Sequence, residues 1–224
     1  MPMVNANALQ RPTIAKDVLS TLRYEIITGK LKDGEYLGEV AISQRMHVSR
    51  GPVRSAIQQL VADGLAVSLE NGRTRVVSLT ERDIEDIYEL RVQLEKKAAN
   101  LLIQSDLTAC MPLLDILNQM KEENDKGESC NSVKMADLGY EVHVCMMQSC
   151  GNKAIWNAWK SMAAILKAIM DLNSEAVDNE RAFLSHKELI ETIVQKQPDA
   201  DKVIERHLLQ DSKDIWYQLS NRTI

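Results

Sequence analysis

Apolar side chains in the first part of the chain recur every three or four positions. They form three such stretches, at about 13–27, 39–46 and 50–62. Residues spaced in this way share one face of an α-helix. We therefore expect three helices, the second of which buries Val40, Ile42 and Met46.

The spacing then changes to that of strands. Two runs of β-branched and aliphatic residues, 65–69 and 74–79, flank the dipeptide Asn71-Gly72. Asn-Gly between two such runs is a strong signal for a β-hairpin, because both residues tolerate the positive φ angles of a tight turn. Three helices followed by a hairpin with a basic tip predict a winged helix-turn-helix.

From Thr80 to the C-terminus the patterns are helical. Thr80, followed three residues later by Asp83, resembles a capping box at the start of a helix. The expected helices cover about 81–104, 107–125, 131–149, 153–173, 178–196 and 199–219. The predicted fold class is mainly α: an N-terminal winged helix-turn-helix with a small β-hairpin wing, and a C-terminal all-α bundle of six or seven helices. We place the domain boundary between residues 79 and 80, which gives domains 1–79 and 80–224.

Charge is distributed unevenly between these domains. The formal net charge is −5, but residues 1–80 hold 10 Lys and Arg against 7 Asp and Glu, whereas residues 81–224 hold 17 against 25. The N-terminal domain can therefore attract a polyanion although the whole chain is acidic. The sequence shows no signal-peptide pattern and no apolar run of membrane-spanning length, so we expect a cytoplasmic location and no membrane partner. The four cysteines lack metal-site spacing and are expected to be free thiols.

The largest local departure in charge lies between Val40 and Ala62, where 23 residues hold no Asp or Glu. Arg50 and Arg54 lie there, one helical turn apart, near the N-terminal end of the third expected helix. In a helix-turn-helix this end enters the major groove, where Arg can bind guanine through two hydrogen bonds and helix N–H groups can bind phosphate. A helix that is merely solvated would normally mix Glu with its arginines. We therefore predict contact with double-stranded DNA.

Residues 36–79 resemble the N-terminal domain of the GntR family of bacterial transcription regulators. The matching segments are Val48-Ser49-Arg50-Gly51-Pro52-Val53-Arg54-Ser55-Ala56-Ile57, Leu60-Val61-Ala62-Asp63-Gly64-Leu65 and Gly72 with Val76-Val77-Ser78-Leu79. The resemblance implies operator contacts by three arginines and the wing glycine. With the neighbouring positions of the helix and the wing, the predicted DNA-binding set is Arg45, Ser49, Arg50, Gly51, Arg54, Gly72 and Arg73.

Three of the four histidines, His143, His186 and His207, lie on separate expected helices of the C-terminal domain. A structural or surface role is the ordinary expectation for each, but three neutral imidazoles that converge can hold zinc or nickel. Residues 81–215 resemble the all-helical FCD effector domain of the FadR subfamily. The resemblance is carried by Leu79–Ile84, Arg91–Glu95, Val142–Asn152, Ser185–Ile193 and His207. It raises the expectation that the three histidines bind a metal and an effector.

One position departs from the subfamily pattern. Metal-binding members place an Asp four residues before the first His, where this chain has Gly139. Three outcomes stay open: the histidines hold a divalent ion with water or an effector carboxylate completing its shell, they bind an anionic effector directly, or the site is inactive. Gly139 would also open room in the pocket for a larger effector. Arg91 is expected to pair either with an effector carboxylate or, in a salt bridge, with Glu95 four residues later or another acid.

These expectations describe a homodimeric DNA-binding transcription regulator, a repressor by the commoner mode of the family, and not an enzyme. Its partners would be a palindromic operator, a small carboxylate-bearing metabolite held by Arg91 and the three histidines, and a second copy of the chain. One alternative is an architectural DNA-binding protein without a ligand, whose helical domain only dimerises. A second is a metal-dependent hydrolase, for which the sequence offers no HExxH, nucleophile-elbow or P-loop motif.

Overall fold

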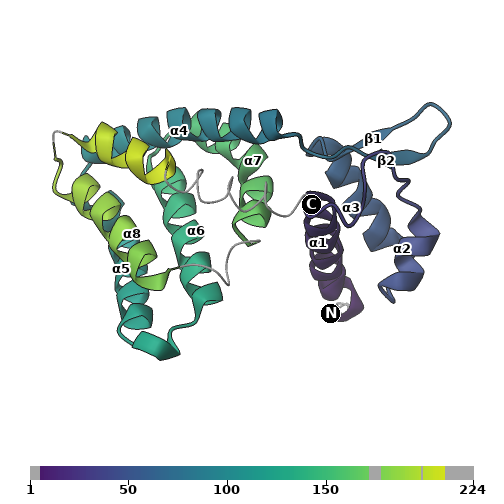
Figure 1. Ribbon diagram of the computed structural model, residues 1–224, viewed down its shortest axis with the longest axis horizontal. Coiled ribbons are helices and arrows are strands. Elements are labelled where there is room, and N and C mark those ends of the chain that lie inside the picture. The colour runs from purple at the N-terminus through teal and green to yellow at the C-terminus, as the bar shows by residue number, and fades with distance from the viewer. Residues whose placement is uncertain (1–5, 172–177, 198, 210–224) are drawn as a thin grey trace, which may run out of the picture. The chain divides into compact units, whose positions relative to one another are not determined.

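The computed structural model describes residues 6–171, 178–197 and 199–209, with side chains described from residue 14 (Figure 1). Contacts divide the chain into two compact units, Met1–Arg82 and Asp83–Ile224, called here the N-terminal and the C-terminal unit. The domain boundary between residues 79 and 80 stays a prediction. None of the helices in the described ranges combines the length and apolarity that a membrane crossing needs.

The N-terminal unit contains the helices and the hairpin in the predicted order. Its elements are α1 (Ala6–Ile27), α2 (Glu39–Arg45), α3 (Arg50–Ala62), β1 (Ala66–Ser68) and β2 (Thr74–Val76). The two strands are antiparallel, with Ala66 opposite Val76, and an isolated bridge joins Tyr36 to Arg75. The winged helix-turn-helix is therefore confirmed.

The core of this unit forms between α1 and α3. The apolar faces that the helical period predicts are buried, and they are completed by residues from the wing: Val18, Leu22, Ile26, Val53, Ile57, Leu60, Leu65 and Val76. Burying one such Leu or Ile side chain contributes about 1.5–3 kcal/mol. This core fixes α3 on its inner face and leaves its outer face to solvent.

Two predictions for this unit are wrong. Helix α1 begins at Ala6 rather than near Thr13, so Pro12 lies inside it. The residues before Pro12 include good helix formers, which favour continuation of the helix although an interior proline removes one backbone hydrogen bond. Val40 is 52% exposed instead of buried, because it lies about 200° around the helix from the buried Ile42.

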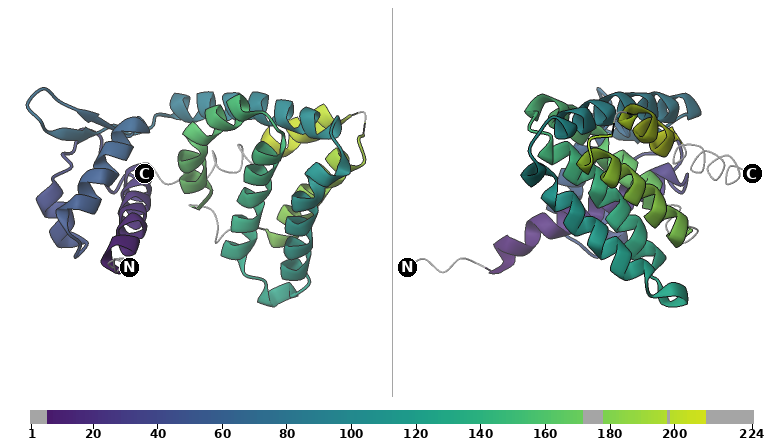
Figure 2. Two further views of the ribbon diagram at one scale, coloured as in Figure 1. Left: turned by 180° about the vertical axis from the view of Figure 1, so that it is seen from behind. Right: turned by 90° about the vertical axis from the view of Figure 1, so that its left-hand side faces the viewer.

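The C-terminal unit is all-helical in its described residues, as predicted. Its elements are α4 (Glu81–Ile103), η1 (Leu107–Cys110), α5 (Met111–Asn124), η2 (Gly127–Ser129), α6 (Ser132–Ser149), α7 (Lys153–Asp171) and α8 (Asn179–Val194), and residues 200–209 are also helical. Helices α5, α6 and α8 pack on one another and α7 packs on α6, while α4 runs crosswise to α6 along the edge of the unit (Figures 1 and 2). The four cysteines are free thiols.

The helix ends in this unit follow local sequence signals. The side chain of Asn131 accepts a hydrogen bond from the backbone N–H of Lys134 and so caps α6, and Asp178 caps α8 through Arg181 in the same way. The predicted helix 107–125 is divided into the short helix η1 and α5, which has Pro112 in its first turn. A proline has no N–H for an intrahelical bond and is therefore favoured where a new helix starts.

The core of the C-terminal unit contains several polar side chains among its apolar residues. The buried polar and charged residues are Arg91, Glu95, Glu123, His143, His186, Thr192 and His207. Burial of such groups is costly unless they are paired or bind a ligand. Five of the seven meet at one place, which is the candidate centre described next.

Candidate DNA interface and histidine centre

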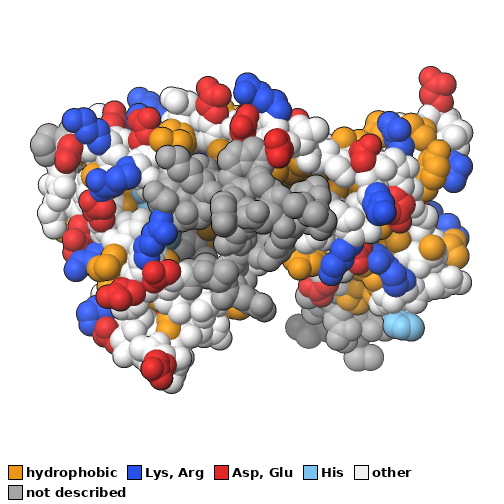
Figure 3. All heavy atoms as spheres, in the orientation of Figure 1, with side chains coloured by type: hydrophobic (Ala, Val, Ile, Leu, Met, Phe, Trp, Pro, Cys, Tyr) orange, Lys and Arg blue, Asp and Glu red, His pale blue; other side chains and the backbone are white. Residues whose placement is uncertain are grey.

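The predicted recognition residues lie at the N-terminal end of α3. Ser49 is the N-cap residue with extended backbone angles, and Arg50 and Gly51 begin the helix. The side chains of Arg50 and Arg54 are 60% and 59% exposed. Figure 3 shows Lys and Arg side chains on the surface of this unit beside carboxylates. The helix end and two guanidinium groups are therefore accessible to a polyanion.

One carboxylate, that of Glu39 at the start of α2, contacts both arginines. Its Oε1 accepts a hydrogen bond from Arg54 Nε at 2.7 Å, and its Oε2 accepts bonds from Arg54 Nη2 at 3.0 Å and Arg50 Nη2 at 3.1 Å. The hydrogen bond from Arg54 is the main reason that the pKa of Glu39 falls from 4.5 to about 2. Glu39 is therefore ionised at neutral pH, and the two arginines share its charge.

Arg45, at the end of α2, has a carboxylate partner of its own. Its Nη1 and Nη2 donate hydrogen bonds to the two carboxylate oxygens of Glu25, at 2.8 and 2.6 Å. Half of the Arg45 side chain is exposed. Contact between Arg45 and DNA would therefore compete with this ion pair.

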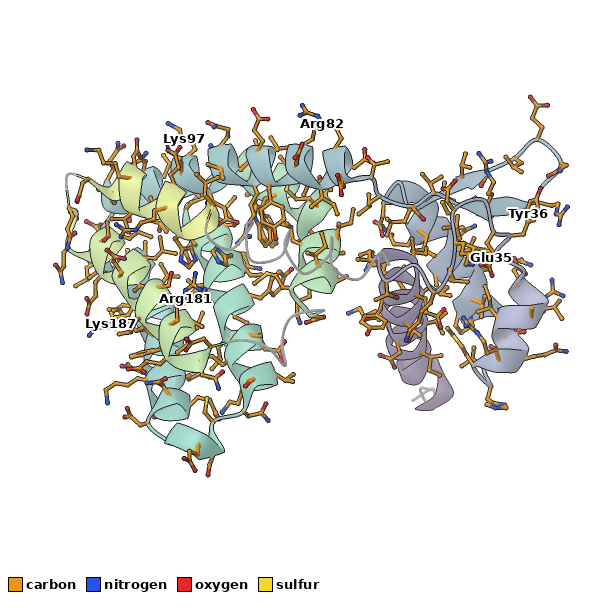
Figure 4. All side chains as sticks on the ribbon, in the orientation of Figure 1. Glu35, Tyr36, Arg82, Lys97, Arg181 and Lys187 are labelled. Atoms are coloured by element: carbon orange, nitrogen blue, oxygen red, sulfur yellow. The ribbon has the colours of Figure 1, made fainter. Side chains whose placement is uncertain are left out.

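The tip of the wing is built around Gly72. Its φ of +76° favours glycine, and its N–H donates a hydrogen bond to the carbonyl of Leu69 at 2.9 Å. The guanidinium carbon of Arg73 lies 3.6 Å from the ring centroid of Tyr36, a cation–π contact. Tyr36 itself lies beside the strands (Figure 4). Tyr36 therefore supports the predicted DNA-contacting arginine of the wing.

The three histidines of the C-terminal unit converge in its core. His143 lies on α6, His186 on α8 and His207 in the helical segment 200–209, and all three are buried. Their candidate ligand atoms lie within 4.8 Å of one another, and His143 Nε2 is 3.4 Å from His207 Nε2. Residues far apart in the sequence thus form one imidazole cluster.

Each of these rings is oriented by a hydrogen bond at Nδ1. His143 Nδ1 donates to Glu95 Oε2 at 2.7 Å and His186 Nδ1 donates to the carbonyl of Ala182 at 2.7 Å, while His207 Nδ1 is 2.6 Å from Ser185 Oγ. Burial, together with repulsion from the neighbouring histidines, holds the pKa of His207 well below its usual 6.5. The ring is therefore neutral at physiological pH, the form that binds metals.

Glu95 connects the histidine cluster to α4 and α7. Its Oε1 accepts hydrogen bonds from Arg91 Nε and from Trp159 Nε1, both at 2.8 Å, and its Oε2 accepts the bond from His143. Burial alone would raise the pKa of this carboxyl, but the positive charge of Arg91 and the contact with His143 hold it well below its usual range. The predicted alternative for Arg91, an ion pair with Glu95, is therefore present.

The prediction that Gly139 opens room for an effector is wrong. A Cβ atom at this position would lie 3.0 Å from Cε1 and 3.1 Å from Nε2 of His186. The imidazole of His186 therefore occupies the space beside Gly139. An Asp at the same position would displace this ring unless the helices moved apart.

The donor set of the cluster fits a divalent metal. Zinc–nitrogen bonds of about 2.0–2.1 Å in a tetrahedral site place two ligand nitrogens about 3.3 Å apart, close to the 3.4 Å between His143 and His207. Because Nδ1 of each ring is already hydrogen-bonded, Nε2 is the nitrogen that can bind a metal ion. In known metal sites, carboxylates and backbone carbonyls orient the histidine ligands in the same way. Three imidazoles suit zinc or nickel and leave coordination positions for water or a ligand.

Comparison with known families accounts for both units. The sequence profile described as "Bacterial regulatory proteins, gntR family" matches residues 14–76, and the profile of the FCD domain matches residues 86–210. The chain belongs to the GntR family. It combines the helix-turn-helix domain of these DNA-binding transcription regulators with an FCD effector domain, as FadR-type members do. The family consists of regulators rather than enzymes.

Individual relatives of this GntR-family chain are distant in sequence. A probable D-xylose utilization operon transcriptional repressor of Paenarthrobacter nicotinovorans is 25% identical, with 89% of this chain and 88% of the relative covered. A gluconate operon transcriptional repressor of Bacillus licheniformis is 24% identical, with 85% and 80% covered. The solved structure of E. coli McbR/YncC aligns with a TM-score of 0.66 at 15% identity, covering 92% of this chain and 98% of that one, which shows the shared fold.

Sequence reasoning missed most of the residues that support the site. Glu39 and Glu25 pair with the predicted recognition arginines, Tyr36 supports the wing, and Trp159 completes the bonds of Glu95. Glu39 was detectable in principle, because it lies directly before the acid-free stretch. The others depend on tertiary contacts that no spacing along the chain reveals.

Proposed function

We propose that this GntR-family protein is a repressor whose affinity for its operator changes when a small carboxylate-bearing metabolite binds at the histidine centre. The observation that supports this is the cluster of His143, His186 and His207 in the core of the FCD domain, oriented by Glu95. Such a cluster is costly to bury, and perturbed buried groups of this kind gather at functional sites. The relatives named as repressors of sugar and gluconate operons support repression and a small organic effector.

The N-terminal unit would contact DNA through α3, the end of α2 and the wing. We propose base or phosphate contacts by Arg45, Ser49, Arg50, Gly51, Arg54, Gly72 and Arg73. The chain would act as a homodimer in the bacterial cytoplasm. Two-fold symmetry then predicts a palindromic operator whose half-sites each bind one winged helix.

The three histidines would hold one zinc or nickel ion through their Nε2 atoms. When bound, the ion supplies a positively charged coordination position that an effector carboxylate can occupy. Glu95 fixes the orientation of His143, and Ser185 that of His207. Arg91 lies beside the cluster with its Nε bonded to Glu95, and its guanidinium group would also donate hydrogen bonds to the effector carboxylate.

A metal-content measurement tests the histidine centre. The full-length protein, purified without chelators and supplied with zinc or nickel, should contain about one ion per chain by elemental analysis. A His143→Ala, His186→Ala double variant should lose this metal. His47→Ala is the matched control, because His47 is exposed in the N-terminal unit, and it should keep the metal. A wild-type protein that takes up neither ion would contradict the metal proposal.

Effector control is tested on the same protein with a labelled duplex selected from random DNA. Small hydroxy acids and sugar acids are screened by thermal shift, with and without zinc, and any that stabilise the protein are added to a DNA-binding titration. Allosteric coupling of about 1–3 kcal/mol corresponds to a change of roughly 5- to 150-fold in DNA affinity. An acid that binds at the histidine centre without changing DNA affinity would contradict the proposed control.

A further inference from the structure

We infer that Glu39 determines DNA-sequence specificity by positioning Arg54 so that the outer edge of its guanidinium group faces a guanine. This inference rests on the proposed DNA contacts of α3. Glu39 itself would be a positioning residue, which acts on the DNA through the arginine that it holds. It lies directly before the acid-free stretch of the sequence, and its carboxylate extends from α2 to α3.

The edge of Arg54 that Glu39 occupies is the decisive detail. Glu39 accepts hydrogen bonds from Nε and Nη2 of Arg54, at 2.7 and 3.0 Å, which is the side of the guanidinium group nearest the aliphatic chain. A guanidinium group has five N–H donors in a planar fork. Because Glu39 bonds only to this side, Nη1 and Nη2 of Arg54 can each still direct one N–H outward, away from the aliphatic chain. That pair matches the O6 and N7 acceptors of guanine in the major groove.

Arg45 shows the opposite arrangement within the same unit. Glu25 accepts from Nη1 and Nη2 of Arg45, so the terminal edge of this guanidinium already faces a carboxylate. Arg45 would have to leave Glu25 before that edge could bind a base. The two ion pairs are therefore predicted to act differently, although each removes one positive charge from the predicted DNA surface.

The negative charge of Glu39 also favours discrimination between DNA sequences over general attraction to the phosphate backbone. Arg50 and Arg54 lie one helical turn apart and share this single carboxylate, which reduces their combined attraction to any phosphate backbone. Specificity is the difference between affinities for the correct and the incorrect sequence. A group that weakens non-specific binding and orients the specific contact increases that difference.

An ordinary surface ion pair is the competing explanation. Exposed pairs contribute little to stability, and the loss of such a pair would not alter sequence preference. The measurement must therefore report preference rather than stability. Full-length wild-type, Glu39→Gln, Arg54→Ala, Arg54→Lys and Glu25→Gln proteins would each be used to select duplexes from a random library, and the enriched sequences would be compared.

We expect the wild-type protein to enrich a palindrome with a guanine in each half-site that Arg54→Ala no longer selects. Glu39→Gln should lose most of its preference at that same position, by about tenfold or more, while its affinity for unrelated duplex DNA stays equal or rises. Arg54→Lys should behave like Glu39→Gln, because a lysine keeps the charge but has no fork for the carboxylate to hold. Glu25→Gln should keep the guanine preference.

The outcomes separate this inference from the function on which it rests. If Arg54→Ala changes the preference and Glu39→Gln does not, Glu39 has no positioning role, although the recognition helix stands. If Arg54→Ala itself leaves the selected sequence unchanged, the assignment of Arg54 as a base contact fails and the inference fails with it. Unfolding curves equal to that of the wild type ensure that each result concerns recognition.

Discussion

At the scale of single residues, the histidine centre of the C-terminal unit depends on hydrogen bonds that orient each imidazole ring. The three histidines could be predicted from the sequence because histidine is rare in this chain and the subfamily pattern marks their positions. Their hydrogen bonds could not, since Glu95 meets His143 only after α4 crosses α6. The sequence shows that Gly139 replaces a carboxylate. It does not show that the imidazole ring of His186 occupies the space beside this glycine.

Substitution of Gly139 tests this interpretation. We expect Gly139→Ala to lower the free energy of unfolding by about 1–2 kcal/mol, because a steric cost of about 1–3 kcal/mol exceeds the gain in helix propensity of up to about 1 kcal/mol. Zinc affinity should fall as well, since His186 must move. Urea unfolding and zinc titration measure the two effects. Tighter zinc binding in Gly139→Ala or Gly139→Asp would show that His186 does not need this space.

At the scale of elements, periodicity predicted nearly every helix and the wing, because an amphipathic pattern and an Asn-Gly turn are local signals. The errors lie at the ends and on the faces of short elements. Val40 and Ile42 of α2 lie on opposite faces of the helix, so only Ile42 is buried, and Pro112 lies where η1 gives way to α5. Tertiary packing and backbone hydrogen bonding decide where a helix ends and which face it buries, and a short stretch of sequence does not show these contacts.

Two glycines of the DNA-binding unit should respond to alanine in opposite ways. Gly51 lies in α3, where a Cβ atom would have open space around it, so Gly51→Ala should stabilise the fold by up to about 1 kcal/mol. It should nevertheless weaken operator binding if the backbone approaches DNA there. Gly72→Ala should destabilise the wing by about 1–2 kcal/mol, because its φ is +76°. Thermal unfolding measures the change in stability of both variants. Gly72→Asn should lose less stability than Gly72→Ala, because asparagine tolerates this φ better.

The turn between α5 and α6 should lose stability in acid. The buried carboxylate of Glu123 accepts hydrogen bonds from Lys126 at 2.7 Å, Asn131 N at 3.0 Å and Lys134 at 2.8 Å. These bonds, that from Lys126 first, lower its pKa from 4.5 to about 2. A lowered pKa means that the stabilisation is complete above about pH 4.5 and is lost as the pH falls toward 2.

Acid unfolding of two variants checks this expectation. Glu123→Gln should be less stable than the wild type at neutral pH and should lose less further stability between pH 4.5 and 2. Glu122→Gln is the matched control, because Glu122 is the exposed neighbour on the same helix, and it should follow the wild-type curve. Equal acid sensitivity of the wild type and Glu123→Gln would refute the role of this carboxylate.

At the scale of the whole molecule, the chain joins a DNA-binding unit to an effector domain. Family membership establishes this combination. The identity of the effector and of the operator is not encoded in a pattern of residue types, because both depend on the fit between atoms in an assembled site. The chemistry of the two sites supports our proposals of a carboxylate-bearing effector at the three imidazoles and of a guanine contact by Arg54.

Operator titration of the full-length protein tests the central claim most directly. With a duplex selected by the wild type, Arg50→Ala and Arg54→Ala should each bind about 5- to 150-fold more weakly, a loss of about 1–3 kcal/mol, with unfolding curves unchanged. Arg206→Ala, which removes an equally exposed arginine from the C-terminal unit, should bind as the wild type does. Wild-type affinity in both recognition variants would contradict the assignment of α3 as the helix that contacts DNA.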